Sequence, residues 1–267
     1  MECNCIPCSF ENPKPTTTAV IIRNGKLFLL KRNEEPFKGE WDFLGGYVDN
    51  GETSEEAMRR EIKEEIGTDS RLTYIGQFSG MAEYEGFDYP VLASAYLAEI
   101  SGEIKLNDEN SEYKWFRMDE IDSVAFDSGK KILAFVKENL NFDLERFKEL
   151  RSQLSGDIVD EQQVYKGVLG GTMKMIYDKD KLIGMGWCEF RDTPTRRQAT
   201  IEDMIVDEEY RRRGHGEKIV KELIEWAREN KCDTIDLVTH PRRIPANELY
   251  KKVGFKLHET NHYLIFL

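Results

Sequence analysis

The stretch GYVDNGETSEEAMRREIKEEIG, residues 46–67, constrains the fold more than any other part of the chain. Thr53 is a favourable N-cap residue, and Glu56 three positions later completes a capping box. Gly67 is a natural residue to follow the last helical turn. Apolar side chains recur every four positions between these ends, which predicts a helix with one buried stripe. The stripe consists of Met58, Ile62 and Ile66.

Three carboxylates of this helix fall together beside the apolar stripe. At about 100° per residue, Glu61, Glu64 and Glu65 share one side, whereas Arg59 and Lys63 point elsewhere. Like charges at helical spacing repel each other by roughly a few tenths of a kcal/mol per pair. One interpretation is a solvated acidic face. The other is a site for hard divalent cations, which bind clusters of oxygen ligands.

The residues around the helix favour the second interpretation. Gly46, five residues, Glu52, seven residues and then REIKEEIG (60–67) form a long, spaced pattern that resembles the Nudix box. Thr68 departs from the aliphatic residue usual in that family, and Leu44 stands where many members have proline. The two strands expected about the Asn24-Gly25 turn, within residues 16–32, also resemble a Nudix domain. The resemblance covers roughly residues 10–140.

The resemblance implies a hydrolase of nucleoside diphosphates linked to another group. By the family pattern, Glu61, Glu64 and Glu65 hold Mg²⁺ or Mn²⁺, and Glu52 pairs with Arg60 to brace the loop against the helix. This assignment agrees with electrostatics, because three carboxylates alone would repel an anionic diphosphate. Bound metal ions reverse the local charge and lower the pKa of a bound water.

The residues leave the hydrolytic base and the substrate open. Any glutamate of the cluster is a candidate base. A loop acid, Glu109 or Glu112, is a further candidate, although an ordinary loop position is the alternative for both. Strands that end in YPVLASAYLAEI resemble those of the branch that acts on ADP-ribose or related dinucleotides. The aromatic side chains in the stretch 81–90 are either base-stacking groups or core residues.

The length suits one large or two ordinary domains, and the composition is that of a globular protein. The chain has 267 residues, of which 40% are hydrophobic and 33% charged, and no apolar run approaches the length of a membrane span. The net charge of −12 argues against nucleic-acid binding. The start MECNCIPCSF lacks the features of a signal peptide, so we expect a cytoplasmic protein. A homodimer is left open.

The pattern changes beyond residue 140, where a second domain is expected. Residues 127–140 predict an amphipathic helix that closes the first domain, and residues 142–156 predict another helix. Strands are expected over 173–178, 181–190 and 199–206, followed by a long helix, a strand over 234–240, a helix over 246–255 and a last strand over 262–267. We therefore divide the chain into a cysteine-bearing segment (1–12) and domains over 13–140 and 141–267.

A basic, glycine-containing loop precedes the long helix of the second domain. A helix N-terminus with glycines before it suits a phosphate group, because backbone N–H groups point outward and the ligand can approach the chain closely. The loop consists of Arg211, Arg212, Arg213, Gly214, His215 and Gly216. Together with ANELYKKVGF (246–255), it resembles the GNAT superfamily of acyl-CoA N-acyltransferases.

This resemblance implies acetyl-CoA as cofactor and an amine acceptor, either a small molecule or a protein. By the family pattern, the backbone from Arg212 to Gly216 cradles the pyrophosphate. Tyr250 protonates the departing thiolate, and Asn247 contacts the cofactor or a water. Glu202 is the candidate base, with a solvent-facing strand position as the alternative. The first strand usual in that family has no clear counterpart here.

The sequence thus predicts an α/β protein in which a Nudix α/β/α sandwich is followed by a GNAT mixed-sheet domain. Two alternatives to a bifunctional enzyme remain: a Nudix hydrolase with a non-catalytic CoA-binding or sensor module, and an acetyltransferase regulated by nucleotide binding. Near the N-terminus, Cys3, Cys5 and Cys8 resemble half of a zinc ribbon. Because a structural zinc ion needs four ligands, we interpret this segment as a remnant.

Overall fold

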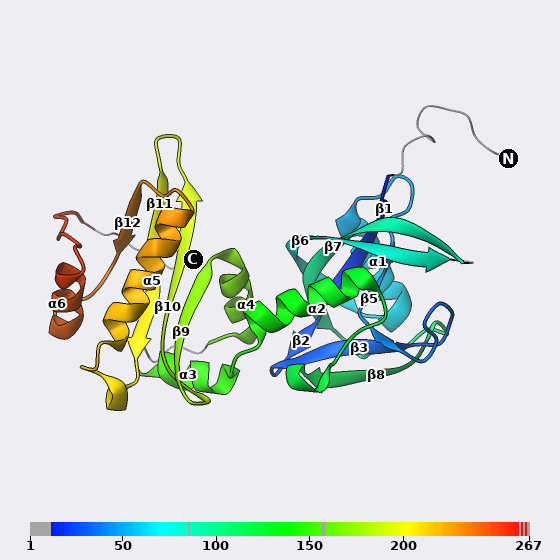
Figure 1. Cartoon of the computed structure of the whole chain (residues 1–267), viewed down its shortest axis with the longest axis horizontal. Coiled ribbons are helices and arrows are strands. Elements are labelled where there is room, and N and C mark those ends of the chain that lie inside the picture. Colours follow the sequence, from blue (N-terminus) through cyan, green and yellow to red (C-terminus); the bar gives the residue numbers. More distant parts are fainter. Residues whose placement is uncertain (1–11, 85, 156–158, 262, 264, 266–267) are drawn as a thin grey trace. The chain divides into compact units, whose positions relative to one another are not determined.

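The computed structural model describes residues 12–84, 86–155, 159–261, 263 and 265, and it is drawn in Figure 1. Cys3, Cys5 and Cys8 lie outside the described residues. The chain divides into two compact units, of which the first contains residues 1–142 and 161–166 and the second contains residues 143–160 and 167–267. No helix in the described part of the chain is long and apolar enough to cross a membrane.

The first unit is built on a four-stranded sheet of order β5-β1-β7-β6. Its strands are β1 (Lys14–Val20), β5 (Leu44–Tyr47), β6 (Asp69–Tyr84) and β7 (Phe87–Ser101). Strand β1 pairs antiparallel with β5 and parallel with β7. The register places Thr17 opposite Gly46 on one side and opposite Ser94 on the other. The glycine pair of β5 therefore lies at one edge of this sheet.

A second sheet of the unit has the order β2-β3-β4, with β8 paired to β3. Its strands are β2 (Ile22–Arg23), β3 (Lys26–Arg32), β4 (Trp41–Asp42) and β8 (Asn110–Arg117). Asn24 and Gly25 both have positive φ, of 51° and 69°, as a tight hairpin turn between β2 and β3 requires. The turn predicted at these two residues is confirmed.

Helix α1 (Ser54–Ile66) forms as its sequence predicts. Thr53 Oγ1 accepts from the Glu56 amide, Glu56 accepts from the Thr53 amide, and Gly67 ends the helix with a φ of 71°. The apolar stripe is fully buried against β1, β3 and β7 in the core of the unit. Helix α2 (Asp127–Leu140) has the predicted bounds and follows a short 3-10 helix, η2 (Met118–Glu120).

The second unit has one sheet of order β12-β11-β10-β9. Its strands are β9 (Thr172–Asp178), β10 (Lys181–Asp192), β11 (Arg197–Val206) and β12 (Thr234–Leu237). Its helices are α3 (Leu144–Ser152), η3 (Glu208–Tyr210), α5 (His215–Glu229) and α6 (Ile244–Lys252). Between β8 and β9 the described residues form helices and connections but no strand. The strand predicted over 262–267 falls largely outside the described residues.

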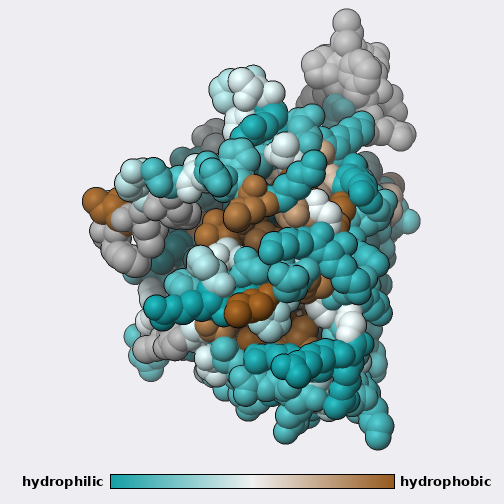
Figure 2. Space-filling model, turned by 90° about the vertical axis from the view of Figure 1, so that its left-hand side faces the viewer, coloured by the Kyte–Doolittle hydropathy of each residue, from teal (hydrophilic) through white to brown (hydrophobic). Residues whose placement is uncertain are grey.

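The core of the second unit lies between its sheet and α5. Gly184 and Gly186 of β10 leave room for Ile219, since a Cβ atom at Gly184 would lie 3.2 Å from the Ile219 side chain. Figure 2 shows the side of the molecule that carries α6 and β12, where hydrophobic groups are exposed among hydrophilic ones. The exposed hydrophobic residues here include Val238, which directly follows β12, and Ile244 of α6.

Helix α4 (Glu161–Gly170) was not predicted, and its first six residues pack with the first unit. Glu161 accepts from the Gly25 amide at 3.1 Å and from the Tyr165 hydroxyl at 3.0 Å. The Gln162 side chain donates to the Ile22 carbonyl at 2.8 Å. These contacts hold the turn between β2 and β3.

Candidate functional site

Strand β5 approaches the acidic side of α1 closely because it carries two glycines. A Cβ atom at Gly46 would overlap the carboxylate of Glu61, and a Cβ atom at Gly45 would overlap the backbone carbonyl of Thr17. Gly46 therefore lets the strand backbone lie against the Glu61 carboxylate, and Gly45 lets β5 lie close to β1. Backbone groups and carboxylate oxygens gather at this point, as expected for a site that binds a cation.

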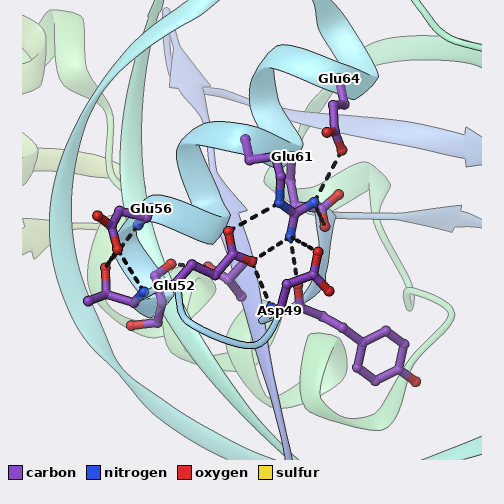
Figure 3. A network of polar contacts seen from close by, with 10 residues as sticks. Asp49, Glu52, Glu56, Glu61 and Glu64 are labelled. Carbon is purple, nitrogen blue, oxygen red and sulfur yellow. Dashed lines mark hydrogen bonds and ion pairs between the residues drawn. The ribbon is translucent and has the colours of Figure 1, made fainter.

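Figure 3 shows Glu52, Glu61 and Glu64 in one polar network beside α1. Arg60 joins them, since the five hydrogen bonds that its guanidinium donates go to these three carboxylates and to the Tyr47 carbonyl. Nε and Nη2 donate to the Glu52 carboxylate at 3.2 and 2.7 Å, and Nη2 also donates to the Tyr47 carbonyl at 2.9 Å. Nη1 donates to Glu61 at 2.8 Å and to Glu64 at 3.1 Å. The structure thus contains the pair of Glu52 and Arg60 that the family pattern implied, and it joins Glu61 and Glu64 to that pair.

Glu65 points away from this network. It is 6% exposed, and its carboxylate accepts from the Gly45 amide at 3.2 Å and from the Asn110 side chain at 2.7 Å. Burial, opposed by the Asn110 hydrogen bond and reinforced by the charge of Glu61, raises the pKa of Glu65 to about 8. Asn110 is a partner that sequence reasoning missed, since nothing local marks it. The carboxylate is therefore well placed for a nearby positive charge to stabilise it.

Burial also raises the pKa of Glu61, with Arg60 acting in the opposite direction and the charges of Glu64 and Glu109 adding to the rise. The described residues contain no group of three or more His, Cys, Asp or Glu side chains already gathered around one metal position. The donor chemistry nevertheless fits a hard dication, because the Glu61 and Glu65 carboxylates, whose pKa values are raised, lie beside the two residues of β5 that have no side chain, Gly45 and Gly46.

The two loop acids differ in their surroundings. Glu112 pairs with Lys31 at 3.7 Å on the exposed surface. Glu109 contributes negative charge at both Glu61 and Glu65, which places it near the cluster. Between the two candidates, only Glu109 is connected electrostatically to the carboxylate site.

A cavity of about 300 Å³ lies at the start of β1, in the first unit. Its lining includes Pro13, Met81, Val91 and Leu92, with Asp127 and Lys131 as charged groups. Close by in the sheet register, the hydroxyl groups of Tyr47 and Tyr89 contact each other. The Lys14 ammonium lies 4.8 Å from the centre of the Tyr89 ring.

The basic loop of the second unit leads into α5 as predicted. Gly214 is the N-cap residue with a φ of 87°, and no side chain caps the helix N-terminus. Arg212 also has a positive φ, of 62°. Arg211 donates to the Val206 carbonyl at 2.9 Å and Arg213 to the Glu209 carbonyl at 3.0 Å, so both side chains fold back onto the protein. An N-terminus of a helix without a side-chain cap leaves backbone N–H groups available to an anion.

Three further residues predicted for the second site, His215, Gly216 and Asn247, lie at the start of α5 and in α6. His215 is the first residue of α5, and Gly216 admits the Leu249 side chain of α6, since a Cβ atom there would lie 3.1 Å from Leu249. The Asn247 side chain donates to the carbonyls of His240 and Arg243 at 3.2 and 3.0 Å. Asn247 therefore fixes the turn before α6.

Tyr250 and Glu202 lie on different elements, α6 and β11. Tyr250 is 9% exposed and packs in the core of the unit, and burial raises its pKa. Glu202 is exposed opposite Trp187, and its pKa is raised by burial and by the charges of Asp203 and Glu189. No direct contact between Tyr250 and Glu202 is found among the described residues.

Comparison with known proteins relates the two parts of the chain to two families. The NUDIX domain model matches residues 13–135, and the Acetyltransferase (GNAT) family model matches residues 142–255. The ADP-ribose pyrophosphatase of Methanocaldococcus jannaschii is 32% identical over 129 residues, which are 48% of this chain and 76% of that protein. Nucleoside triphosphatase NudI of Escherichia coli O139:H28 is 30% identical over 118 residues, 40% of this chain and 84% of that protein.

Solved structures of both kinds resemble parts of the chain. A MutT NUDIX hydrolase from Burkholderia pseudomallei is 31% identical with a TM-score of 0.42, covering 46% of this chain and 98% of that chain. A Trypanosoma brucei acetyltransferase is 24% identical with a TM-score of 0.40, covering 46% of this chain and 93% of that chain.

Proposed function

The chain belongs to the Nudix family and carries a GNAT acetyltransferase domain after its Nudix domain, and from this premise we propose that the first domain is a metal-dependent diphosphate hydrolase. The observation that carries the proposal is the approach of β5 to α1, where Gly46 lies against the Glu61 carboxylate and the Gly45 amide donates to Glu65. We retain domain bounds of 13–140 and 141–267 as part of this proposal.

In the proposed mechanism, Glu61, Glu64 and Glu65 would hold Mg²⁺ or Mn²⁺, and the ion would supply positive charge to offset the anionic diphosphate and to make the attacking water more acidic. Arg60 and Glu52 fix the loop before α1, so that the β5 backbone stays beside the carboxylates. The Gly45 amide and the Asn110 side chain would orient Glu65 through their hydrogen bonds to its carboxylate. A carboxylate of this cluster accepts the proton of the attacking water.

For the substrate we propose ADP-ribose or a related dinucleotide. The similarity to a protein named as an ADP-ribose pyrophosphatase supports this choice.

A hydrolysis screen with Mg²⁺ tests this substrate class. ADP-ribose, a dinucleotide and nucleoside triphosphates are supplied separately, and the products are separated by chromatography. We expect AMP and ribose 5-phosphate from ADP-ribose, because cleavage falls within the diphosphate. Turnover of nucleoside triphosphates alone would contradict the proposed substrate and would favour the chemistry named for the NudI relative.

For the second domain we propose transfer of an acetyl group from acetyl-CoA to an amine. The uncapped N-terminus of α5, with Gly214 at positive φ before it, supports a pyrophosphate site on the backbone of 212–216. Tyr250 would act as acid and Glu202 as base. Incubation with radiolabelled acetyl-CoA and a panel of amines tests the transfer, with labelled product as the expected result.

One observation favours a second candidate, a CoA-binding or sensor module without turnover. Tyr250 is buried in the core and the Asn247 amide is engaged by backbone carbonyls, so neither side chain is free to reach a ligand as the unit stands. Binding of acetyl-CoA without labelled product, across the amine panel, would support this candidate over the transferase.

A further inference from the structure

The guanidinium of Arg60 has two functionally distinct ends. One end, Nε with Nη2, forms a bidentate ion pair with Glu52. Glu52 in turn accepts a hydrogen bond from the Asp49 amide at 2.7 Å. The other end, Nη1, contacts only carboxylates that the metal proposal needs, those of Glu61 and Glu64. Arg60 therefore neutralises part of the acidic cluster.

We propose that Arg60 is the resident cation of the metal-free site, and that a divalent ion displaces its Nη1 end from Glu64 while Glu52 keeps the rest of the guanidinium in place. This inference rests on the proposed metal-dependent function. It assigns Arg60 a second role besides bracing the loop: it competes with the metal and so lowers the affinity of the empty site.

Glu64 is the carboxylate that changes partner because it is the least constrained. Its side chain is 57% exposed and its contact with Nη1 is 3.1 Å, whereas Glu61 is largely buried with a contact of 2.8 Å. Glu65 needs no release from Arg60, since its oxygens are already held by Gly45 and Asn110. Movement of one exposed side chain is then enough to complete the set of ligands.

Competition follows from charge. A guanidinium and a dication that share the same carboxylates lie only a few ångströms apart, where like charges repel strongly even at the effective dielectric near a protein surface. Binding of the ion therefore favours loss of the Nη1 contacts. The bidentate pair with Glu52 opposes complete displacement of the guanidinium, because its two charge-assisted hydrogen bonds do not involve the proposed metal ligands.

The test compares Arg60→Gln with Arg59→Gln in the full chain. Arg59 is one position away on the same helix, and its guanidinium binds Glu55 and the Ser70 carbonyl instead of the cluster. Binding of Mn²⁺ is measured from the electron paramagnetic resonance signal of the free ion. We expect Arg60→Gln to bind Mn²⁺ at least about tenfold more tightly than wild type, since a competing charge is gone, and Arg59→Gln to bind like wild type.

Unchanged or weaker binding in Arg60→Gln would overturn the inference and leave Arg60 as a bracing residue only. Failure of the proposed function looks different: the wild type would then bind no Mn²⁺ at millimolar concentration. A second measurement uses wild type and needs no variant to fold. In ¹⁵N-arginine-labelled protein, Mg²⁺ should speed solvent exchange of the Arg60 Nη1 protons and leave Nε protected; unchanged Nη1 exchange with bound Mg²⁺ would contradict displacement.

Discussion

The backbone amide of Gly45 donates a hydrogen bond to Glu65 Oε1 at 3.2 Å, which joins β5 to the last turn of α1. The three glutamates predicted as ligands are thus held in two ways. Glu65 is fixed by Gly45 and Asn110, whereas Glu61 and Glu64 are held by Arg60. This division explains why the cluster is close together and yet not gathered around a single point.

Replacing Gly46 with alanine should impair hydrolysis and leave the fold intact. The new Cβ atom would overlap the Glu61 carboxylate and push it from its position, while Gly46 does not need positive φ. We expect a loss of roughly 100-fold in kcat/KM, about 2.7 kcal/mol of transition-state stabilisation. Gly167→Ala is the control, because a Cβ atom there meets nothing within 4 Å. Equal activity of both variants would argue against the Gly46–Glu61 contact.

Replacing Asn110 with alanine should lower stability. The buried Oε2 of Glu65 would lose its 2.7 Å hydrogen bond, and an unsatisfied buried acceptor costs about 1–3 kcal/mol. Urea unfolding at pH 8 should show the loss as a lower midpoint without a change in slope. The double variant with Glu65→Gln should lose less than the sum of the two single changes, since the two residues are in contact. Additive losses would contradict the coupling.

Asp42 should make the protein less stable as the pH rises. Burial raises its pKa from 3.8 to about 7, and its Oδ1 atom is buried without a hydrogen-bond partner. The unfolded chain releases this proton near pH 4 and the folded chain near pH 7. The unfolded state therefore binds fewer protons in this window, and the free energy of unfolding falls as pH rises, by an amount on the order of a few kcal/mol.

Asp42→Asn should remove this pH dependence. The stability of the variant relative to wild type should therefore rise between pH 4 and pH 7 and stay constant above pH 7. Thermal unfolding at pH 5 and pH 8 measures the difference. Asp88→Asn, at an exposed position, is the control and should follow wild type. If the melting temperatures of wild type and Asp42→Asn changed equally between pH 5 and pH 8, Asp42 would be ionised in the folded protein over this whole range.

The sequence predicted those elements whose caps, turn residues and apolar periodicity lie within the element itself or directly beside it. Helix α1 has its capping box and glycine stop, α2 has its predicted bounds, and the turn at Asn24-Gly25 forms. Helix α4 was missed because its N-terminal contacts are remote: Glu161 bonds to Gly25, 136 positions away. Such pairing leaves no pattern within a short window of sequence.

The candidate site divides in the same way. Spacing within one helix places Glu61, Glu64 and Glu65 on one side, and the family pattern implied the pair of Glu52 and Arg60. Asn110 could not be found, since its role depends on β8 reaching α1 across 45 positions. Whether Arg60 also contacts Glu61 and Glu64 depends on side-chain rotamers, which the sequence does not specify.

The second domain is tested by acetyl-CoA binding. At 100 times the dissociation constant, acetyl-CoA should add about 2.7 kcal/mol of stability, seen as a melting shift. Gly214→Val should abolish the shift, because Gly214 has a φ of 87° that a β-branched residue avoids. Gly214→Asn should retain part of the melting shift, because asparagine tolerates this conformation better than valine does.

Tyr250→Phe should keep the melting shift with acetyl-CoA and slow acetyl transfer ~100-fold, because the proposed acid is missing. No shift in wild type would favour an accessory module without a CoA site.

The central claim is that the carboxylate cluster of α1 uses a divalent metal to cleave a diphosphate. The most direct measurement is the rate of ADP-ribose hydrolysis by wild type and Glu65→Gln, each with Mg²⁺ and with EDTA. We predict that wild-type turnover requires Mg²⁺, and that Glu65→Gln, with its fold intact by circular dichroism, loses ~100-fold or more. Wild-type turnover that persists undiminished in EDTA, or a Glu65→Gln variant as active as wild type, would contradict the claim.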